Sequence, residues 1–138
     1  MGKNPRRDET DSRSFAHSPQ GAEGRVAARG NPFRTYIKTS RSSDRTVILL
    51  HGLYQNRSMC IPYVDMYRDM GYNVLLIDQR GQGESGGSHT TWGLRETDDL
   101  DAWTEWLRGK DGGVKIGMHG ISLGAAMALI YSGTERGK

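Results

Sequence analysis

The chain has 138 residues, of which 35% are hydrophobic and 25% charged, with a formal net charge of +3 at pH 7. This length allows one domain, and the single cysteine, Cys60, excludes an intrachain disulfide; we therefore expect a cytoplasmic protein in which Cys60 is a small buried hydrophobe. The longest apolar runs, such as residues 47–50 and 125–131, are far too short to span a membrane, so we expect no membrane partner.

The N-terminal segment carries most of the positive charge. Residues 1–45 hold ten Lys or Arg against five Asp or Glu, a net charge of +5, whereas residues 46–138 hold nine against eleven, a net charge of −2. Residues 1–33 show no sustained hydrophobic period, so we expect a disordered basic tail without a signal peptide. Because acidic residues are mixed into this tail and only Phe15 and Phe33 offer stacking nearby, we expect no nucleic-acid partner.

The chain after this tail begins with a short predicted edge strand at residues 34–40. Residues 46–50 then form a continuous apolar, β-branched run, as expected of a strand covered on both faces, and residues 73–77 are predicted to form a second buried strand. Between these two strands, large apolar residues recur with the period of an amphipathic helix, which Gly71 ends. The predicted apolar stripe of this helix consists of Met59, Tyr63, Met66, Tyr67 and Met70.

The later part of the chain continues this alternation. A second helix with one apolar face is followed by a third strand at residues 115–119 and a third helix at residues 123–131, with Gly133 as its C-cap. The apolar face of the second helix consists of Leu100, Trp103 and Leu107, with Trp106 beside them. Strands alternating with helices predict parallel strands joined by right-handed crossovers, hence an α/β fold with a mostly parallel sheet flanked by helices.

In such open sheets, functional groups gather beyond the carboxyl ends of the strands. The predicted strands are followed by residues 51–52, by Asp78 and by residues 119–122. The last of these segments leads into residues 120–124, GISLG, which match the G-x-S-x-G pattern. This pattern lies between a predicted strand and a predicted helix, which is the context of a nucleophile elbow.

A serine at the apex of such a turn must adopt a strained backbone conformation, and glycine at positions 120 and 124 leaves room for the neighbouring chain. Ser122 would then stand at the N-terminus of the third helix, where backbone N–H groups and the helix dipole favour a developing oxyanion. We therefore predict Ser122 as a catalytic nucleophile and Gly120 and Gly124 as its motif glycines. The alternative is an ordinary tight turn.

An oxyanion hole needs a second backbone N–H group, from the loop after a neighbouring strand. The sequence Leu50-His51-Gly52-Leu53 follows the first buried strand and can supply it. We predict the backbone N–H groups of Leu53 and Leu123 as the two donors, with Gly52 as a further motif glycine. We interpret His51 as a strand-end imidazole that holds its own loop in shape, rather than as a proton-transfer group.

Two other patterns compete with this interpretation. Residues 81–86, GQGESG, match the dinucleotide-binding pattern G-x-G-x-x-G, but a loop rather than a helix follows them, and the acidic residues about 20 positions further on lie in a predicted helix. His51, Asp78 and His119 all follow or end strands and are conceivable metal ligands, but nothing in their spacing is diagnostic. We therefore expect no cofactor and no metal.

Three segments, taken in order, resemble the α/β-hydrolase superfamily, and in particular its bacterial esterases and prolyl-oligopeptidase-like serine hydrolases. They are Thr46-Val-Ile-Leu-Leu-His-Gly52, Asp78-Gln-Arg-Gly-Gln-Gly-Glu-Ser85 and His119-Gly-Ile-Ser-Leu-Gly-Ala125. The resemblance implies a partial α/β-hydrolase fold over residues 34–138 and a small-molecule acyl substrate. It implies Ser122 as the nucleophile and Leu53 and Leu123 as the oxyanion donors. The residues that it implies to shape a loop rather than do chemistry are Asp78, Arg80, Gly81 and Gly83.

The resemblance also implies an acid and a histidine that follow the serine in the chain. After Ser122 the sequence has no Asp and no His, and its only acid is Glu135. We therefore expect residues 34–138 to be the N-terminal half of a hydrolase domain, truncated after the helix that follows the elbow and weakly active or inactive. His89, on a predicted loop, stays open as an alternative base.

The third predicted strand, residues 115–119, suggests a different function. In the complete family sheet this strand would be central, so here one of its sides would present unpaired N–H and C=O groups. We expect a poorly stable monomer, or a protein partner or self-association at this edge. The alternative to a serine hydrolase is thus a non-catalytic α/β-hydrolase-like binding module.

Overall fold

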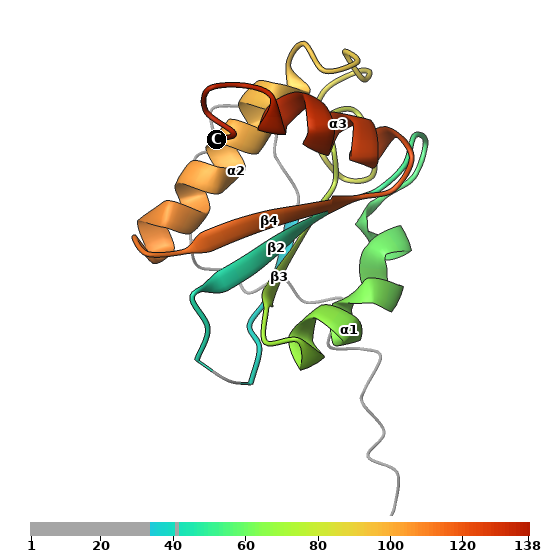
Figure 1. The fold of residues 1–138 in the computed structure, drawn as a ribbon. Coiled ribbons are helices and arrows are strands. Elements are labelled where there is room, and N and C mark those ends of the chain that lie inside the picture. The colour runs from blue at the N-terminus through green and yellow to red at the C-terminus, as the bar shows by residue number, and fades with distance from the viewer. Residues whose placement is uncertain (1–33, 41) are drawn as a thin grey trace, which may run out of the picture.

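The computed structural model describes residues 34–40 and 42–138 of the chain (Figure 1). The predicted disordered tail, residues 1–33, lies outside the described residues. The described part forms a four-stranded sheet with helices on both faces, which confirms the predicted α/β architecture.

The sheet has the strand order β1-β3-β2-β4. Its strands are β1 (Arg34–Ile37), β2 (Arg45–Leu50), β3 (Asn73–Ile77) and β4 (Lys115–Gly120). Strands β2, β3 and β4 are parallel, as predicted, and β1 pairs with β3 in the antiparallel direction at one edge. Leu50 is in register with Ile77 on one side and Gly120 on the other. The three parallel strands therefore end at the same level, and the residues that follow them meet at one end of the sheet.

Helices cover the two faces of the sheet (Figure 1). The helices are α2 (Glu96–Lys110) and α3 (Leu123–Ser132) on one face, and the 3₁₀ helix η2 (Arg57–Tyr63) and α1 (Val64–Asp69) on the other. Successive residues of a strand point to opposite faces, so each face has its own core. The core under α2 and α3 consists of Ile48, Leu50, Leu75, Ile77, Leu100, Trp103, Leu107, Leu123, Met127 and Tyr131. The core under α1 consists of Val47, Leu49, Cys60, Val64, Val74 and Leu76.

The two helices α2 and α3 follow the prediction closely. Leu100, Trp103 and Leu107 are each at most 2% exposed, which confirms the predicted apolar face of α2. Helix α3 ends at Ser132 with Gly133 as its C-cap, as predicted. The φ angle of Gly133 is −77°, so this cap is not left-handed.

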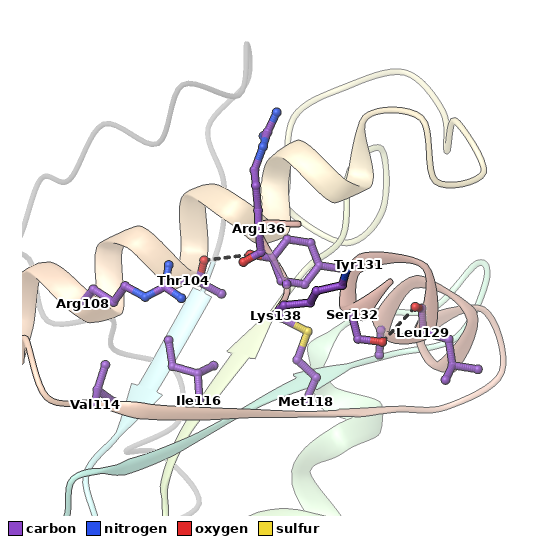
Figure 2. A pocket seen from close by; sticks show the side chains of 12 residues that line it. Thr104, Arg108, Val114, Ile116, Met118, Leu129, Tyr131, Ser132, Arg136 and Lys138 are labelled. Carbon is purple, nitrogen blue, oxygen red and sulfur yellow. Dashed lines mark hydrogen bonds between the residues drawn. The ribbon is translucent and has the colours of Figure 1, made fainter. Parts of the chain in front are cut away.

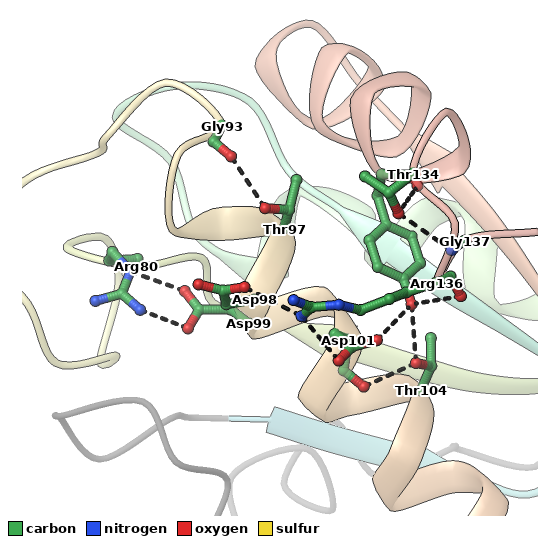
Figure 3. Close-up of polar contacts among 11 residues, drawn as sticks. Arg80, Gly93, Thr97, Asp98, Asp99, Asp101, Thr104, Thr134, Arg136 and Gly137 are labelled. Carbon is green, nitrogen blue, oxygen red and sulfur yellow. Dashed lines mark hydrogen bonds and ion pairs between the residues drawn. The ribbon is translucent and has the colours of Figure 1, made fainter.

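Polar contacts tie the end of α3 to α2 (Figure 3). The Tyr131 hydroxyl lies 3.1 Å from Thr104 Oγ1 on α2. Just beyond α3, Arg136 Nη1 donates to carboxylate oxygens of Asp98 and Asp101, at 3.2 and 3.1 Å. These contacts hold the C-terminal end of α3 against α2.

The predicted stripe over residues 59–70 is right for Tyr63 and Tyr67, which pack against the core under α1, and wrong for Met66 and Met70. This segment is a 3₁₀ helix that contains Pro62, followed by only six residues of α-helix. A 3₁₀ helix has about three residues per turn, so a stripe spaced for an α-helix does not stay on one face. The buried residues are Cys60 and Val64 instead, while Met66 and Met70 are 46% and 55% exposed. Gly71, with φ +82°, follows the helix as predicted.

The structure bears on the predicted burial of Cys60 and on the predicted lack of a membrane-spanning segment. Cys60 is buried in the core under α1, as predicted. Burial, together with the nearby charge of Asp78, raises the pKa of its thiol to about 11, so it is not a reactive thiolate near neutral pH. Among the residues described, no helix has the length and apolar character needed to cross a membrane.

Candidate active site

The G-x-S-x-G segment forms a sharp turn between β4 and α3. Strand β4 ends at Gly120, helix α3 begins at Leu123, and Ser122 between them has φ 54° and ψ −117°. A non-glycine residue with positive φ is strained, and such residues concentrate at functional sites. The Ile121 N–H donates to the Leu50 carbonyl at 3.0 Å, which fastens the turn to the end of β2. Ser122 is exposed, and its hydroxyl has no hydrogen-bond partner among the described residues.

Backbone contacts explain the glycines on both sides of Ser122. A Cβ atom at Gly120 would lie 2.2 Å from the backbone carbonyl of Gly124. A Cβ atom at Gly124 would lie 2.2 Å from the Leu50 carbonyl oxygen and 2.7 Å from that of His51. Neither position has room for a side chain, so close packing of main chains holds the turn in shape.

The loop after β2 passes next to this turn. A Cβ atom at Gly52 would lie 3.5 Å from Ser122 Cβ and 3.6 Å from the Ile121 carbonyl oxygen. Within the described part of the chain, the N–H groups of Leu53 and Leu123 donate to no other group. Leu123 is the first residue of α3, where N–H groups point away from the helix and its dipole favours negative charge. The arrangement therefore leaves two main-chain donors available near Ser122.

His51 is part of the structure that supports the loop after β2. Its side chain is fully buried, and its Nε2 accepts the Gln79 N–H at 3.0 Å. The proton is therefore on Nδ1, which donates to the Gly52 carbonyl at 2.7 Å. Burial lowers the pKa of His51 by more than the Gly52 carbonyl and the Asp78 charge raise it. A neutral, doubly hydrogen-bonded ring fits the predicted structural role.

Polar side chains of the loop after β3 hold the loop after β2 in place through hydrogen bonds and an ion pair. Asp78 accepts the Arg57 N–H at 2.7 Å and pairs with the Arg57 guanidinium. The Gln79 side chain donates to the His51 carbonyl, and Gln82 Oε1 accepts the Tyr54 N–H at 2.6 Å. Further along the same loop, Arg80 forms a two-bond ion pair with Asp99 on α2, at 2.6 and 2.9 Å (Figure 3).

The side chains that join the two loops, those of Arg57, Gln79 and Gln82, were not predicted from the sequence. Their partners are 21 to 28 positions away in the chain, as the separations of the Arg57–Asp78 and Tyr54–Gln82 bonds show. The polar run that follows β3 indicated that the loop after β3 is important. It did not indicate that this loop contacts the loop after β2.

The glycines of residues 81–86 serve the same loop and do not open a helix. Gly83, with φ +57°, packs against the Asp78 carboxylate, which a Cβ atom there would touch at 2.4 Å. Gly81, with φ +70°, packs against the backbone of His89. Helix α2 begins only at Glu96. A dinucleotide fingerprint requires its turn to run straight into a helix, so this geometry does not fit one.

The structure separates the conceivable metal ligands. His119 lies on the α1 side of the sheet, where the Tyr67 hydroxyl is 2.9 Å from its Nδ1 and the Tyr63 ring is 4.7 Å from its ring centre. His51 and Asp78 have the partners described above. In the part of the chain that the structure describes, no three His, Cys, Asp or Glu side chains are grouped so as to hold a metal ion.

No described imidazole or carboxylate is hydrogen-bonded to Ser122. His89 is exposed, and its Nδ1 lies 2.7 Å from the Ser88 hydroxyl. Glu135 pairs with Lys138 beyond the far end of α3. The described residues thus contain the serine and the two amides, without a base in contact with the serine.

The cavity in Figure 2, of about 400 Å³, is separate from this site. It lies between α2, β4 and the C-terminal half of α3, and Met118, Leu129 and Arg136 are among its lining residues. Ser122 precedes the opposite end of α3. This cavity is therefore not where a substrate would meet the serine.

The fold agrees with comparisons to known proteins. The sequence model of the alpha/beta hydrolase fold family matches residues 45–137, which include the three parallel strands and the serine turn. The chain belongs to the α/β-hydrolase fold family.

The chain is similar to several individual proteins of this family. The protein YqkD of Bacillus subtilis is 37% identical over 111 residues, which are 79% of this chain and 36% of YqkD. The Pyrococcus furiosus esterase Pf2001 is 34% identical with a TM-score of 0.60, over 72% of this chain and 45% of that one. XC6422 of Xanthomonas campestris shares the fold at 24% identity, with a TM-score of 0.66, over 73% of this chain and 50% of that one. The chain spans about a third to a half of the length of these proteins.

Proposed function

We propose that this chain carries the nucleophile and the oxyanion hole of a serine hydrolase, which cleaves ester, thioester or amide bonds through an acyl-enzyme on Ser122. One observation carries the proposal. Ser122 occupies the apex of the turn between β4 and α3 with φ 54° and ψ −117°, and its hydroxyl is exposed. The likeness to an esterase at 34% identity favours esters among the three substrate classes.

In the proposed reaction, Ser122 Oγ forms a bond to the acyl carbon of a small substrate, and the bond from this carbon to the leaving group breaks. The hydroxyl proton goes to the departing alcohol, thiol or amine, and water then releases the acid and restores the serine. The N–H groups of Leu53 and Leu123 donate to the oxyanion of the tetrahedral intermediate. Each such donor is typically worth about 3 kcal/mol in the transition state.

We further propose that residues 34–138 act as the N-terminal, nucleophile-bearing half of a hydrolase domain. The match to less than half of the Pf2001 chain supports this division. Loss of the acid and base of a catalytic triad typically costs several powers of ten in rate. Since no described histidine or carboxylate contacts Ser122, we expect acylation of the serine with weak turnover or none.

Covalent labelling tests the proposal. The full chain is incubated with an alkyl fluorophosphonate, and its intact mass is followed with time. We expect slow addition of one phosphonyl group, with loss of fluoride, and no addition to Ser122→Ala. Ser132→Ala is the matched control, because Ser132 is an exposed serine at the other end of α3. Absence of labelling in the unaltered chain, or equal labelling in Ser122→Ala, contradicts the proposal.

A second candidate function rests on the edge of the sheet. Among the described strands β4 pairs only with β2, so one row of its N–H and C=O groups is unpaired. The cavity beside this edge is lined by Ile116, Met118 and Leu129, and Leu129 is 73% exposed (Figure 2). An open strand next to apolar side chains is suited to a protein partner or a second copy of this chain.

Light scattering over a range of protein concentrations tests the self-association half of this candidate. If β4 and the adjoining cavity form the contact, the mass rises with concentration, and Leu129→Lys returns it to that of a monomer. Ile61→Lys is the control, since Ile61 is also exposed but lies on η2, on the other face of the sheet. A chain that stays monomeric at every concentration argues against self-association.

A further inference from the structure

Gln82 is a loop residue with an unusual degree of burial. It lies between two positive-φ glycines in the loop after β3, and yet it is only 9% exposed. Its Oε1 accepts the Tyr54 N–H at 2.6 Å, across 28 positions of the chain. Tyr54 immediately follows Leu53. This bond is therefore made by the Leu53–Tyr54 peptide, which adjoins the proposed oxyanion donor, the Leu53 N–H.

Tyr54 does not hold this peptide in place by its own side chain. Its ring is 90% exposed, and its φ of 57° is one that side-chain-bearing residues rarely adopt. Among the described residues, only Tyr54, Trp92 and Ser122 combine a side chain with positive φ. A strained conformation persists only where its surroundings impose it. At Tyr54, the hydrogen bond to Gln82 is the polar contact that does so, beside the packing of the preceding Leu53 side chain against the core under α2 and α3.

The other end of the Gln82 amide supports this interpretation. Its Nε2 is buried and has no hydrogen-bond partner in the described part of the chain. An unpaired buried donor is destabilising, so a contribution to stability alone does not explain why a glutamine occupies position 82. Because this nitrogen has no exposed surface, it is not placed to meet a substrate. The acceptor oxygen is the part of the side chain with a function.

We propose that Gln82 is a positioning residue for the oxyanion hole. Its Oε1 fixes the Leu53–Tyr54 peptide and thereby keeps the Leu53 N–H in place beside the serine turn. The inference rests on the proposed function, because it assigns Gln82 a role in the reaction of Ser122. Gln79 and Asp78 hold other points of the same loop, at His51 and Arg57, whereas Gln82 holds the point nearest to the donor.

Substitutions at Gln82 separate its acceptor oxygen from its bulk. Gln82→Met keeps the length and removes both the acceptor and the unpaired donor, whereas Gln82→Glu keeps an acceptor at the same reach. Gln55→Met is the matched control, because Gln55 lies on the same loop as Tyr54 and is exposed. Each full-length variant is compared for amide hydrogen exchange at Tyr54, measured by NMR, for the rate of Ser122 phosphonylation by the fluorophosphonate, and for unfolding by urea.

We expect Tyr54 exchange to be at least tenfold faster in Gln82→Met, and phosphonylation at least tenfold slower, with little change in the urea midpoint. Gln82→Glu restores both quantities to within about threefold of the unaltered chain, and Gln55→Met changes neither. A merely structural role would move the urea midpoint together with the labelling rate. If Gln82→Met does not fold, Gln82→Asn, which is one methylene shorter, takes its place with the same expectation.

Two outcomes overturn the inference: unchanged Tyr54 exchange in Gln82→Met, or faster exchange with unchanged phosphonylation. Failure of the proposed function gives a different result, because the unaltered chain is then not phosphonylated at all. In that case the inferred role in the reaction falls with the function, while Tyr54 exchange still decides whether Gln82 fixes the loop.

Discussion

The two main-chain segments that meet at the candidate site are held in place in different ways. The turn at residues 120–124 depends on main chains in contact, where glycine is required because a Cβ atom would lie 2.2 Å from a backbone carbonyl. The loop at residues 51–57 depends on hydrogen bonds with residues far away in the sequence: Asp78 and Gln82 accept from its backbone, and Gln79 donates to it. One side of the proposed oxyanion hole is thus fixed by close packing of main chains and the other by polar contacts between loops. Substitutions should affect the two segments differently.

The largest effect is expected at the serine turn. Gly124→Ala puts a Cβ atom 2.2 Å from the Leu50 carbonyl oxygen, so main chains must separate. We expect a loss of at least about 4 kcal/mol in unfolding free energy, measured with urea, or no folded protein. Gly109→Ala is the control, because nothing lies within 4 Å of a Cβ atom there and alanine favours the helix, by about 0.5 to 1 kcal/mol. A mild effect at Gly124 would mean that packing does not fix the turn.

Acid should act on contacts that need an ionised carboxylate and leave the glycine turn untouched. Glu96, only 4% exposed, accepts hydrogen bonds from Thr91 and Gly93 in the loop before α2. Burial would raise the pKa of its carboxyl, but hydrogen bonds from the side chain and backbone of Thr91 and the backbone of Gly93 outweigh burial and lower it from 4.5 to about 2.

The lowered pKa of Glu96 means that its contribution to stability is complete above pH 4.5 and is lost as the pH falls toward 2. The loss should reach about 3 kcal/mol, since one pKa unit corresponds to about 1.4 kcal/mol. Urea unfolding at a series of pH values measures it. Glu96→Gln should flatten the dependence between pH 4.5 and 2, whereas Glu105→Gln, an exposed control on α2, should not. Equal pH dependence in both variants contradicts this assignment.

A smaller effect is expected from the polar contacts that hold the loop after β2. Asp78→Asn keeps the size of a fully buried side chain but turns one acceptor into a donor that faces the N–H groups of Arg57 and Glu84. We expect a loss of about 2 kcal/mol in unfolding free energy. Asp65→Asn, whose carboxylate is 90% exposed, should stay within about 0.5 kcal/mol. Equal changes in unfolding free energy at the two positions would contradict the view that Asp78 holds the loop after β2 in place.

The smallest effect is expected from the Tyr54 ring. Since this ring is 90% exposed, Tyr54→Ala should change the unfolding free energy by no more than about 0.5 kcal/mol. Ser122 phosphonylation should also continue, because the Tyr54 N–H that Gln82 accepts belongs to the backbone and is kept. A large loss of stability would show that the ring, rather than Gln82, holds the loop.

The contrast between the two segments also explains what the sequence could predict. The turn was predictable because its determinants, Gly120, Ser122 and Gly124, lie within five positions and require one backbone geometry. The strands were predictable because, for example, residues 74–77 form an unbroken apolar run, as expected of a strand covered on both faces. In both cases local sequence and tertiary structure impose the same conformation.

The parts that the sequence did not predict depend on tertiary contacts. Residues 59–70 carry apolar side chains at helical spacing, but Pro62 lies in a 3₁₀ turn and the core takes up Cys60 and Val64. The polar contacts between the loops after β2 and β3 have no periodic signal, because Gln82 becomes significant only when Tyr54 is brought next to it by the pairing of β2 with β3. A single sequence does not record such a pairing of loops.

The central claim is that Ser122 stands between two main-chain amides that receive an oxyanion. A crystal structure of the fluorophosphonate adduct of the full chain tests it most directly. The account predicts phosphorus bonded to Ser122 Oγ, with one phosphonyl oxygen about 2.7 to 3.1 Å from both Leu53 N and Leu123 N. An adduct on another residue, or a phosphonyl oxygen that faces solvent away from Leu53, would contradict the account.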